Sequence, residues 1–166
     1  LEPTRIQLDV IHGFVAGSYW ASGMPRETLA RAIANSVCVG AYRDGAQVGF
    51  ARVVTDRATF AYLADVFVLP DHGGKGLAKA MVQALHDHPE LQGLRRWMLA
   101  TSDAHGVYAA LGWQPIAQPE LFMQRHDPDV YQRGAAWARC APILRSSPRM
   151  SRRAAACSTS GAATVR

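Results

Sequence analysis

One stretch of the sequence, residues 63–82, limits the fold more than any other, because it changes from strand to helix across a glycine loop. Its first part is an apolar run of strand character that ends at Pro70, and Gly73, Gly74 and Gly76 follow. The apolar residues after the loop recur with the spacing of one helix face: Leu77, Ala80, Met81, Ala84 and Leu85. The first N–H groups of a helix have no partner within it, and the helix dipole adds partial positive charge there. The stretch therefore predicts a site for phosphate or diphosphate.

Two well-known phosphate motifs do not fit this loop. No Ser or Thr follows a Gly-Lys pair at the spacing of a P-loop, and Lys79 stands where a dinucleotide fingerprint has its third glycine. A glycine turn before an ordinary core helix is the alternative that stays open. Lys75 and Lys79 add formal positive charge beside the loop, which favours the anion site.

The loop resembles motif A of the GCN5-related N-acetyltransferases, the GNAT superfamily. The matching register is Gly73-Gly74-Lys75-Gly76-Leu77-Ala78. Its last glycine and its alanine fit the family pattern, whereas Gly73 stands where the family has Arg or Gln. The backbone donors of such a loop do not depend on that side chain.

A second segment, residues 101–113, is similar to another hallmark of the family. There a strand end is followed by a short helix with a tyrosine, and then by glycine and an aromatic residue. Tyr108, Gly112 and Trp113 match this pattern, and Thr101 replaces the common Asn. The two motifs follow each other in the order and at the separation typical of small single-domain bacterial members.

The resemblance implies an α+β fold of three layers, the GNAT acyl-CoA N-acyltransferase fold. Its mixed central sheet combines an antiparallel meander with a splayed pair of parallel strands, and helices flank it. The local patterns predict helices over 10–18, 25–35, 77–86 and 104–111, and strands over 37–42, 47–55, 60–69, 97–100, 113–117 and 121–124. Asp9 is expected to cap the first helix, and the strand 97–100 is expected to be buried and parallel to 60–69.

Composition assigns the folded domain to residues 1–133 and a tail to residues 134–166. The chain of 166 residues has a formal net charge of +5, but the tail holds six Arg and no acid. Residues 1–133 therefore carry 12 Lys and Arg against 13 Asp and Glu. This balance gives no electrostatic case for nucleic acid. The Ala, Arg, Ser and Gly content of the tail predicts disorder.

Cysteine usage and hydropathy indicate the expected cellular compartment. The three cysteines form no C-x-x-C motif or Cys/His cluster, so neither a metal site nor a disulfide framework is indicated. No apolar run reaches the ~18 residues of a membrane span, and the N-terminus lacks a signal-peptide pattern. We therefore expect a cytoplasmic protein without a membrane partner. The resemblance leaves a homodimer open.

The resemblance implies acetyl-CoA as cosubstrate, with its diphosphate on the glycine loop. The pantetheine would then run back along the strand that feeds the loop and pair with its backbone like an added strand. One backbone N–H there would polarise the thioester carbonyl. The implied cofactor-binding residues are Val66, Phe67, Val68, Gly73, Gly74, Lys75, Gly76, Leu77, Ala78 and Lys79.

Tyr108 matches the position of the family's general acid. A phenol with a reference pKa of ~10 can protonate a thiolate whose acid has a pKa of ~8.5; the alternative is a tyrosine that only packs. Asp65 is the one charge in its apolar strand, so burial requires a partner or a solvated cleft. It is a candidate base for the amine, or a structural carboxylate at the bulge where the family splays this strand.

The resemblance implies that the first helical region forms one wall of the acceptor site, so aromatic residues before the second helix would line it. Tyr19 and Trp20 are candidates there, with core packing as the alternative, and His105 beside Tyr108 is a candidate acceptor-site or surface residue. The function that these motifs favour is direct acetyl transfer to a primary amine of a small molecule. The alternative is a GNAT-fold module that binds coenzyme A without turnover.

Overall fold

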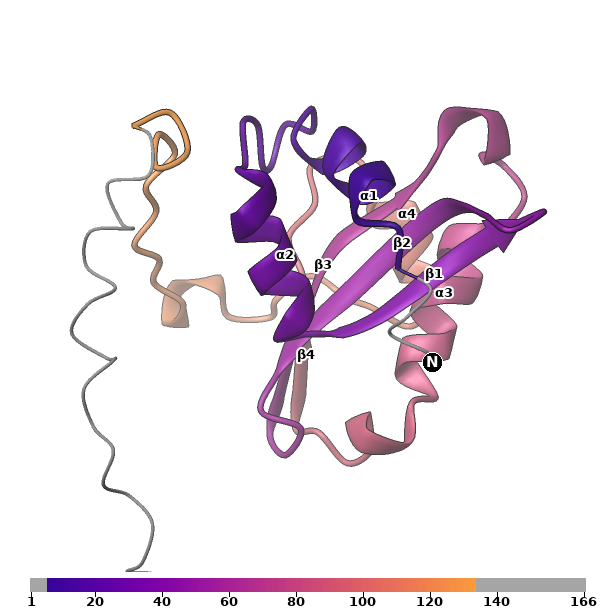
Figure 1. The fold of residues 1–166 in the computed structure, drawn as a ribbon. Coiled ribbons are helices and arrows are strands. Elements are labelled where there is room, and N and C mark those ends of the chain that lie inside the picture. The colour runs from indigo at the N-terminus through magenta and orange to yellow at the C-terminus, as the bar shows by residue number, and fades with distance from the viewer. Residues whose placement is uncertain (1–5, 134–166) are drawn as a thin grey trace, which may run out of the picture. The chain divides into compact units, whose positions relative to one another are not determined.

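The computed structural model describes residues 6–133 of the chain. In chain order its elements, several of them labelled in Figure 1, are α1 (Leu8–Val15), α2 (Arg26–Ala34), β1 (Val37–Arg43), β2 (Ala46–Thr55), β3 (Phe60–Val68), η2 (Pro70–His72), α3 (Leu77–His86), η3 (Pro89–Leu91), β4 (Arg96–Met98), α4 (His105–Ala109) and η4 (Pro119–Leu121). The predicted tail, residues 134–166, lies outside the described residues. Within residues 6–133, no helix is long and apolar enough to cross a membrane.

Three strands of the mixed sheet form the predicted meander, because tight turns join them. The sheet order is β1-β2-β3-β4, with antiparallel pairs except for β3 and β4, which are parallel as predicted. Asp44 and Gly45 have φ of 51° and 82° between β1 and β2. Two successive positive φ values suit a two-residue hairpin and the twist of its strands. The next turn is held by Asp56, whose Oδ1 accepts from three backbone N–H groups.

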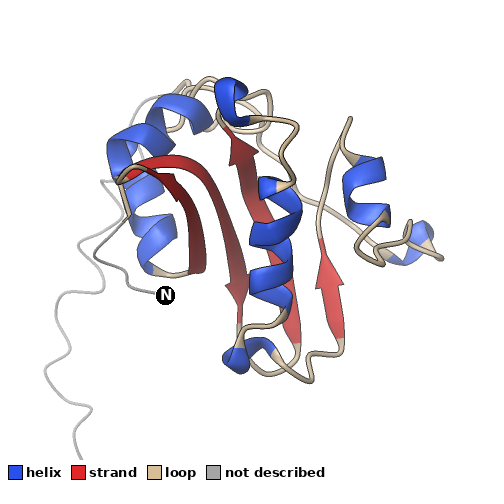
Figure 2. Ribbon diagram, turned by 90° about the vertical axis from the view of Figure 1, so that its right-hand side faces the viewer, coloured by secondary structure: helices blue, strands red, loops and turns tan. Residues whose placement is uncertain are grey.

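Helices cover both faces of the sheet, as Figures 1 and 2 show. On one face α3 packs Met81, Val82 and Leu85 against β1, β2 and β3. On the other face Ile11 of α1 and Leu29 of α2 pack on the sheet around Phe50 and Phe67. The predicted face of α3 is partly wrong, since Ala80 and Ala84 are exposed. Val82 takes their place because a larger apolar side chain gains more from burial.

A bulge in β3 changes which face its side chains meet. The register with β2 shifts between Phe50 and Arg52, opposite Asp65, whose φ is 51°. Before the bulge Leu63 belongs to the α3 face, and after it Phe67 belongs to the α1 face. An extra residue in one strand has this effect because side chains alternate with a period of two. The bulge lies where the GNAT resemblance implies one.

The N-terminal helices begin near their predicted positions, but their caps differ. The cap of α1 is Gln7, and Asp9 lies in the first turn, where it pairs with Arg26 at 2.8 Å. Gln7 is held there because its N–H donates to Gln47 Oε1, and its own Oε1 accepts from the Gln47 N–H. Asp9 as cap is therefore wrong. Pro25 precedes α2 as its cap.

At the edge of the sheet formed by β4, the described structure has fewer strands than predicted. Residues 113–117 and 121–124 form no strand, and β4 is the last strand of the described sheet. Pro115 interrupts the first segment, because proline has no N–H for a ladder. Pro119 begins η4, which takes up Leu121 at the start of the second segment. As an edge strand, β4 is not buried as predicted: Trp97 and Met98 are half-buried and Arg96 is exposed.

Candidate active site

The loop between β3 and α3 carries a row of unpaired backbone N–H groups. Gly74 and Gly76 have φ of 71° and 76°, a region that glycine enters at little cost. Gly76 precedes the first residue of α3, Leu77. Within residues 6–133, no hydrogen bond uses the N–H groups of residues 74–79 as donors. These donors stand at the positive end of the α3 dipole, which is the geometry of an anion site.

Other groups of the loop are already engaged. The N–H of Gly73 donates to the carbonyl oxygen of Pro70 at 3.0 Å, so it is not available. Lys75 Nζ donates to the backbone oxygen of Asp71 at 3.3 Å, and Lys79 is exposed on α3. The loop therefore combines main-chain donors with two positive charges close by in sequence.

Next to this loop, β3 leaves its parallel neighbour. The β3–β4 register runs only from Phe60 opposite Arg96 to Tyr62 opposite Met98. Beyond Tyr62, the edge of β3 that faces β4 has no strand partner among the described residues. Val66, Phe67 and Val68 belong to this open edge, which leads from the pocket to the glycine loop. Their side chains have other roles; Phe67 is buried and stacks on Phe14 with ring centroids 4.1 Å apart.

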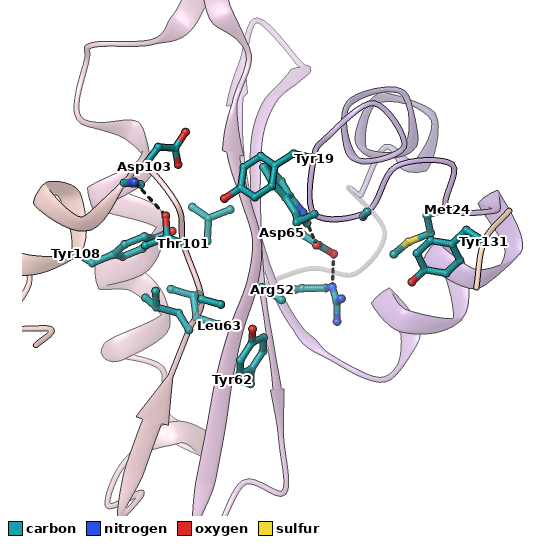
Figure 3. Close-up of a pocket in the computed structure, with 17 residues that line it drawn as sticks. Tyr19, Met24, Arg52, Tyr62, Leu63, Asp65, Thr101, Asp103, Tyr108 and Tyr131 are labelled. Carbon is teal, nitrogen blue, oxygen red and sulfur yellow. Dashed lines mark hydrogen bonds and ion pairs between the residues drawn. The ribbon is translucent and has the colours of Figure 1, made fainter. Parts of the chain in front are cut away.

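A pocket of about 320 Å³ opens where the two strands diverge. It is lined from β2, β3, the segment after β4, α4 and the α1–α2 connection. The lining side chains that Figure 3 labels are Tyr19, Met24, Arg52, Tyr62, Leu63, Asp65, Thr101, Asp103, Tyr108 and Tyr131. Figure 3 shows Tyr108 on one side and Tyr131 on the opposite side, with Asp65 between them. The structure thus brings five predicted site residues to one cavity: Tyr19, Trp20, Asp65, Val66 and Tyr108.

Asp65 has the partners that its burial requires. Its Oδ2 accepts from Arg52 Nε at 2.6 Å, and its Oδ1 accepts from Trp20 Nε1 at 3.2 Å. The carboxylate side chain is only 4% exposed. Removing two charges from water is expensive, so a pair of this kind holds its neighbours in place more than it adds net stability. Trp20 is positioned over the pocket by this bond.

Tyr108, the predicted proton donor, lies in the wall of the pocket. It is half-buried on α4, and burial raises the pKa of its phenol above the ordinary value of 10.0. The neighbouring Tyr19 and Asp103 raise that pKa further. The hydroxyl of Tyr19 itself accepts from the Ser102 N–H at 3.2 Å, which ties the α1–α2 connection to the segment after β4. A tyrosine with a raised pKa keeps its proton over the neutral range.

His105 lies elsewhere. It lines a second, apolar cavity of about 790 Å³ along β4, with Trp97, Trp113 and Ile116. Tyr108 contributes to the walls of both cavities. The structure therefore does not bring His105 into the pocket that holds Asp65. Among residues 6–133, no three His, Cys, Asp or Glu side chains are grouped so that they could hold a metal ion.

The pocket also contains residues that the sequence analysis missed. Arg52 is the lone charge in the apolar strand β2, the same signal that singles out Asp65. Tyr62 and Met24 line the pocket but have no distinguishing pattern. Tyr131 comes from the last described turn and packs against the α1–α2 cluster. No pattern in the neighbouring sequence distinguishes Tyr131, because it reaches the pocket only through the path of the chain after η4.

Comparison with known proteins agrees with this architecture. A family model described as the acetyltransferase (GNAT) family matches residues 9–113. A candidate acetyltransferase of Gibberella zeae is 35% identical over 125 residues, which are 61% of this chain and 70% of that protein. The region matched by the family model contains both the glycine loop and Tyr108.

Solved structures are similar to most of the chain. A candidate acetyltransferase of the GNAT family from Xanthomonas campestris is 48% identical, with a TM-score of 0.76 over 78% of this chain and 92% of that one. An aminoglycoside N-acetyltransferase in complex with CoA is 20% identical, with a TM-score of 0.57 over 76% of this chain and 91% of that one. At that identity the second likeness shows the fold alone.

Proposed function

The chain belongs to the acetyltransferase (GNAT) family, and we propose that it transfers an acetyl group from acetyl-CoA to a primary amine of a small acceptor. The observation that carries the proposal is one continuous path. It starts at the unpaired N–H groups of residues 74–79, follows the open edge of β3, and ends in the pocket with Tyr108. A protein of the same fold was solved with CoA, which supports this choice of cosubstrate.

The residues of the path fit such a ligand. The N–H groups of residues 74–79 would hold the diphosphate, and Lys75 and Lys79 would add charge. The free edge at Val66, Phe67 and Val68 would pair with the amides of the pantetheine as an added strand does. Bound acetyl-CoA would supply the thioester. A backbone N–H of this edge would polarise its carbonyl.

Direct transfer moves two protons as the C–N bond forms and the C–S bond breaks. Tyr108 would give its proton to the departing sulfur, for which a phenol that is still protonated at neutral pH is suited. The amine would lose its proton toward Asp65, through water, because the Asp65 side chain is only 4% exposed. Tyr19 and Trp20 would form the wall that orients the acceptor.

A thiol-release assay tests the proposal. Acetyl-CoA is incubated with the protein and a panel of primary amines, and free thiol is followed by a colorimetric reagent. We expect turnover with at least one amine, and a loss of about 10²-fold or more in kcat for Tyr108→Phe. Tyr62→Phe is the matched control, because Tyr62 lines the same pocket from β3.

Two outcomes would contradict the proposal in different ways. Equal losses in Tyr108→Phe and Tyr62→Phe would refute the acid role. Binding of CoA without turnover on any amine would favour a non-catalytic binding module, the alternative to which the departures at Gly73 and Thr101 point. We also propose that the protein acts in the cytoplasm, the compartment that its cysteine usage predicts.

A further inference from the structure

Arg52 is a nearly buried guanidinium with donors to spare. Its side chain is 12% exposed and lines the pocket. Nε donates to Asp65, and Nη1 donates to Ser36 Oγ at 3.2 Å. A guanidinium has five N–H groups, and within residues 6–133 no other hydrogen bond of Arg52 is found. The remaining donors are therefore available to whatever occupies the pocket.

Asp65 does not occupy all the hydrogen-bond donors of Arg52. A carboxylate that faces a guanidinium often binds it with both oxygens, but Asp65 gives one oxygen to Arg52 and the other to Trp20. The pair is thus held in one orientation by a third residue. This arrangement leaves the N–H groups of Nη2 and the second N–H of Nη1 for a second carboxylate.

The charges around the pocket favour an acceptor that carries both a positive and a negative charge. Arg52 is the one cationic side chain among the described residues that line it, and Asp65 and Asp103 are the acidic ones. An acceptor with an amine alone would leave the spare donors of Arg52 without an ionic partner. Solvent reaches these spare donors in the open pocket. An acceptor that covers them without replacing the hydrogen bonds of that solvent loses free energy, so an acceptor that satisfies them is favoured.

We propose that the acceptor carries a carboxylate that binds Arg52, and is a small compound of the amino acid type. The inference rests on the proposed function and narrows its acceptor class. Figure 3 shows Arg52 and Asp65 between Tyr108 on one side and Tyr131 on the other. A carboxylate at Arg52 would let the amine of the same small molecule point toward Tyr108. The pocket of about 320 Å³ is at the small end of ligand sites, which fits such a compound.

The test compares matched acceptors on the unaltered protein. The panel contains amino acids whose amine and carboxylate are separated by one to four carbons, each beside its primary amide. We expect kcat/KM to be roughly tenfold to a hundredfold higher for the best acid than for its amide, the effect of a hydrogen-bonded charge. Calorimetric binding of the acids and amides to the protein with CoA gives a second readout.

Variants then assign the preference to Arg52. Arg52→Lys keeps the positive charge but not the fork, and should reduce the ratio of acid to amide. The double variant Arg52→Gln with Asp65→Asn removes both charges, so no unpaired ion is left in the core. Because Asp65 is also the proposed base, this variant is read by calorimetric binding, where it should abolish the preference for acids. Arg26→Gln is the control, because Arg26 pairs with Asp9 at the surface outside the pocket.

The outcomes separate this inference from the proposed function. Equal kcat/KM for acids and amides would overturn the inference and leave acetyl transfer standing. Tight binding of acids without any transfer would overturn the proposed function and leave the carboxylate site. A preference that survives in the double variant would also overturn the role of Arg52.

Discussion

Gly76→Ala tests the glycine loop with a change that adds one methyl group. A Cβ built on Gly76 meets no atom within 4 Å, so the substitution creates no clash. Its cost comes from the backbone alone, because φ is +76° and ψ is 4°. For a residue with a Cβ, that left-handed conformation costs about 1–2 kcal/mol.

The cost must appear in one of two measurements. If the fold keeps the loop in place, the free energy of unfolding falls by about 1–2 kcal/mol. If the exposed loop relaxes instead, it must return to this conformation to bind, and CoA affinity falls roughly fivefold to thirtyfold. Asparagine tolerates the left-handed region better, so Gly76→Asn should lose less in the same measurement.

Gly45→Ala is the matched control. Gly45 has a φ of +82°, and a Cβ added to it also meets no atom within 4 Å, but it belongs to the β1–β2 hairpin and not to the residues 74–79 with unpaired N–H groups. Both variants are studied by urea unfolding and by calorimetric titration with CoA. We expect Gly45→Ala to lower stability and leave affinity unchanged, whereas Gly76→Ala lowers the stability, the affinity for CoA, or both. Unchanged stability and affinity in Gly76→Ala would refute the assignment of the strain and of the diphosphate site.

Three further results follow from the same structure. The kcat of the transfer reaction should hold with rising pH until above 10, and the fall there should be absent in Tyr108→Phe, because burial raises the pKa of that phenol. Arg52→Met should cost about 3 kcal/mol in urea unfolding, since it leaves Asp65 buried and unpaired, and adding Asp65→Asn should recover part of the loss. Burial lowers the pKa of His86 below its ordinary 6.5, so the unfolded chain binds the proton more readily. The melting temperature should therefore fall as the pH drops below about 6.5, and less so in His86→Phe.

The parts of the fold that sequence predicted best are those encoded by neighbouring residues. The strand–loop–helix unit over 63–82 and the short connection between the predicted strands 37–42 and 47–55 each depend on a few adjacent positions, and the structure has both. The strands predicted over 113–117 and 121–124 are wrong: Pro115 interrupts the first, and η4, which begins at Pro119, takes up the start of the second. A proline in an expected ladder is a stronger signal than the spacing around it.

The pocket was only partly predictable, because its contacts cross between elements. Asp65 stands out in the sequence as a lone charge, but its partner depends on the β2–β3 register and on the bulge, which together place Arg52 beside it. His105 was expected near the acceptor, yet the short helix α4 turns it toward the other cavity. Periodicity cannot decide the orientation of a helix so short. Tyr131 depends on the path of the chain after η4.

The hydrogen-bond donors of the glycine loop belong to the main chain, and this affects how related sequences can diverge in function. Main-chain N–H groups are present whatever side chains residues 74–79 carry, provided that the turn can form. The opposite wall is built from side chains contributed by segments as distant as Tyr19 and Tyr131. Substitutions in that wall can therefore change which acceptor is selected, while the N–H groups of the loop still bind the same acyl donor. Descendants of one gene could in this way acquire new acceptors through a few substitutions.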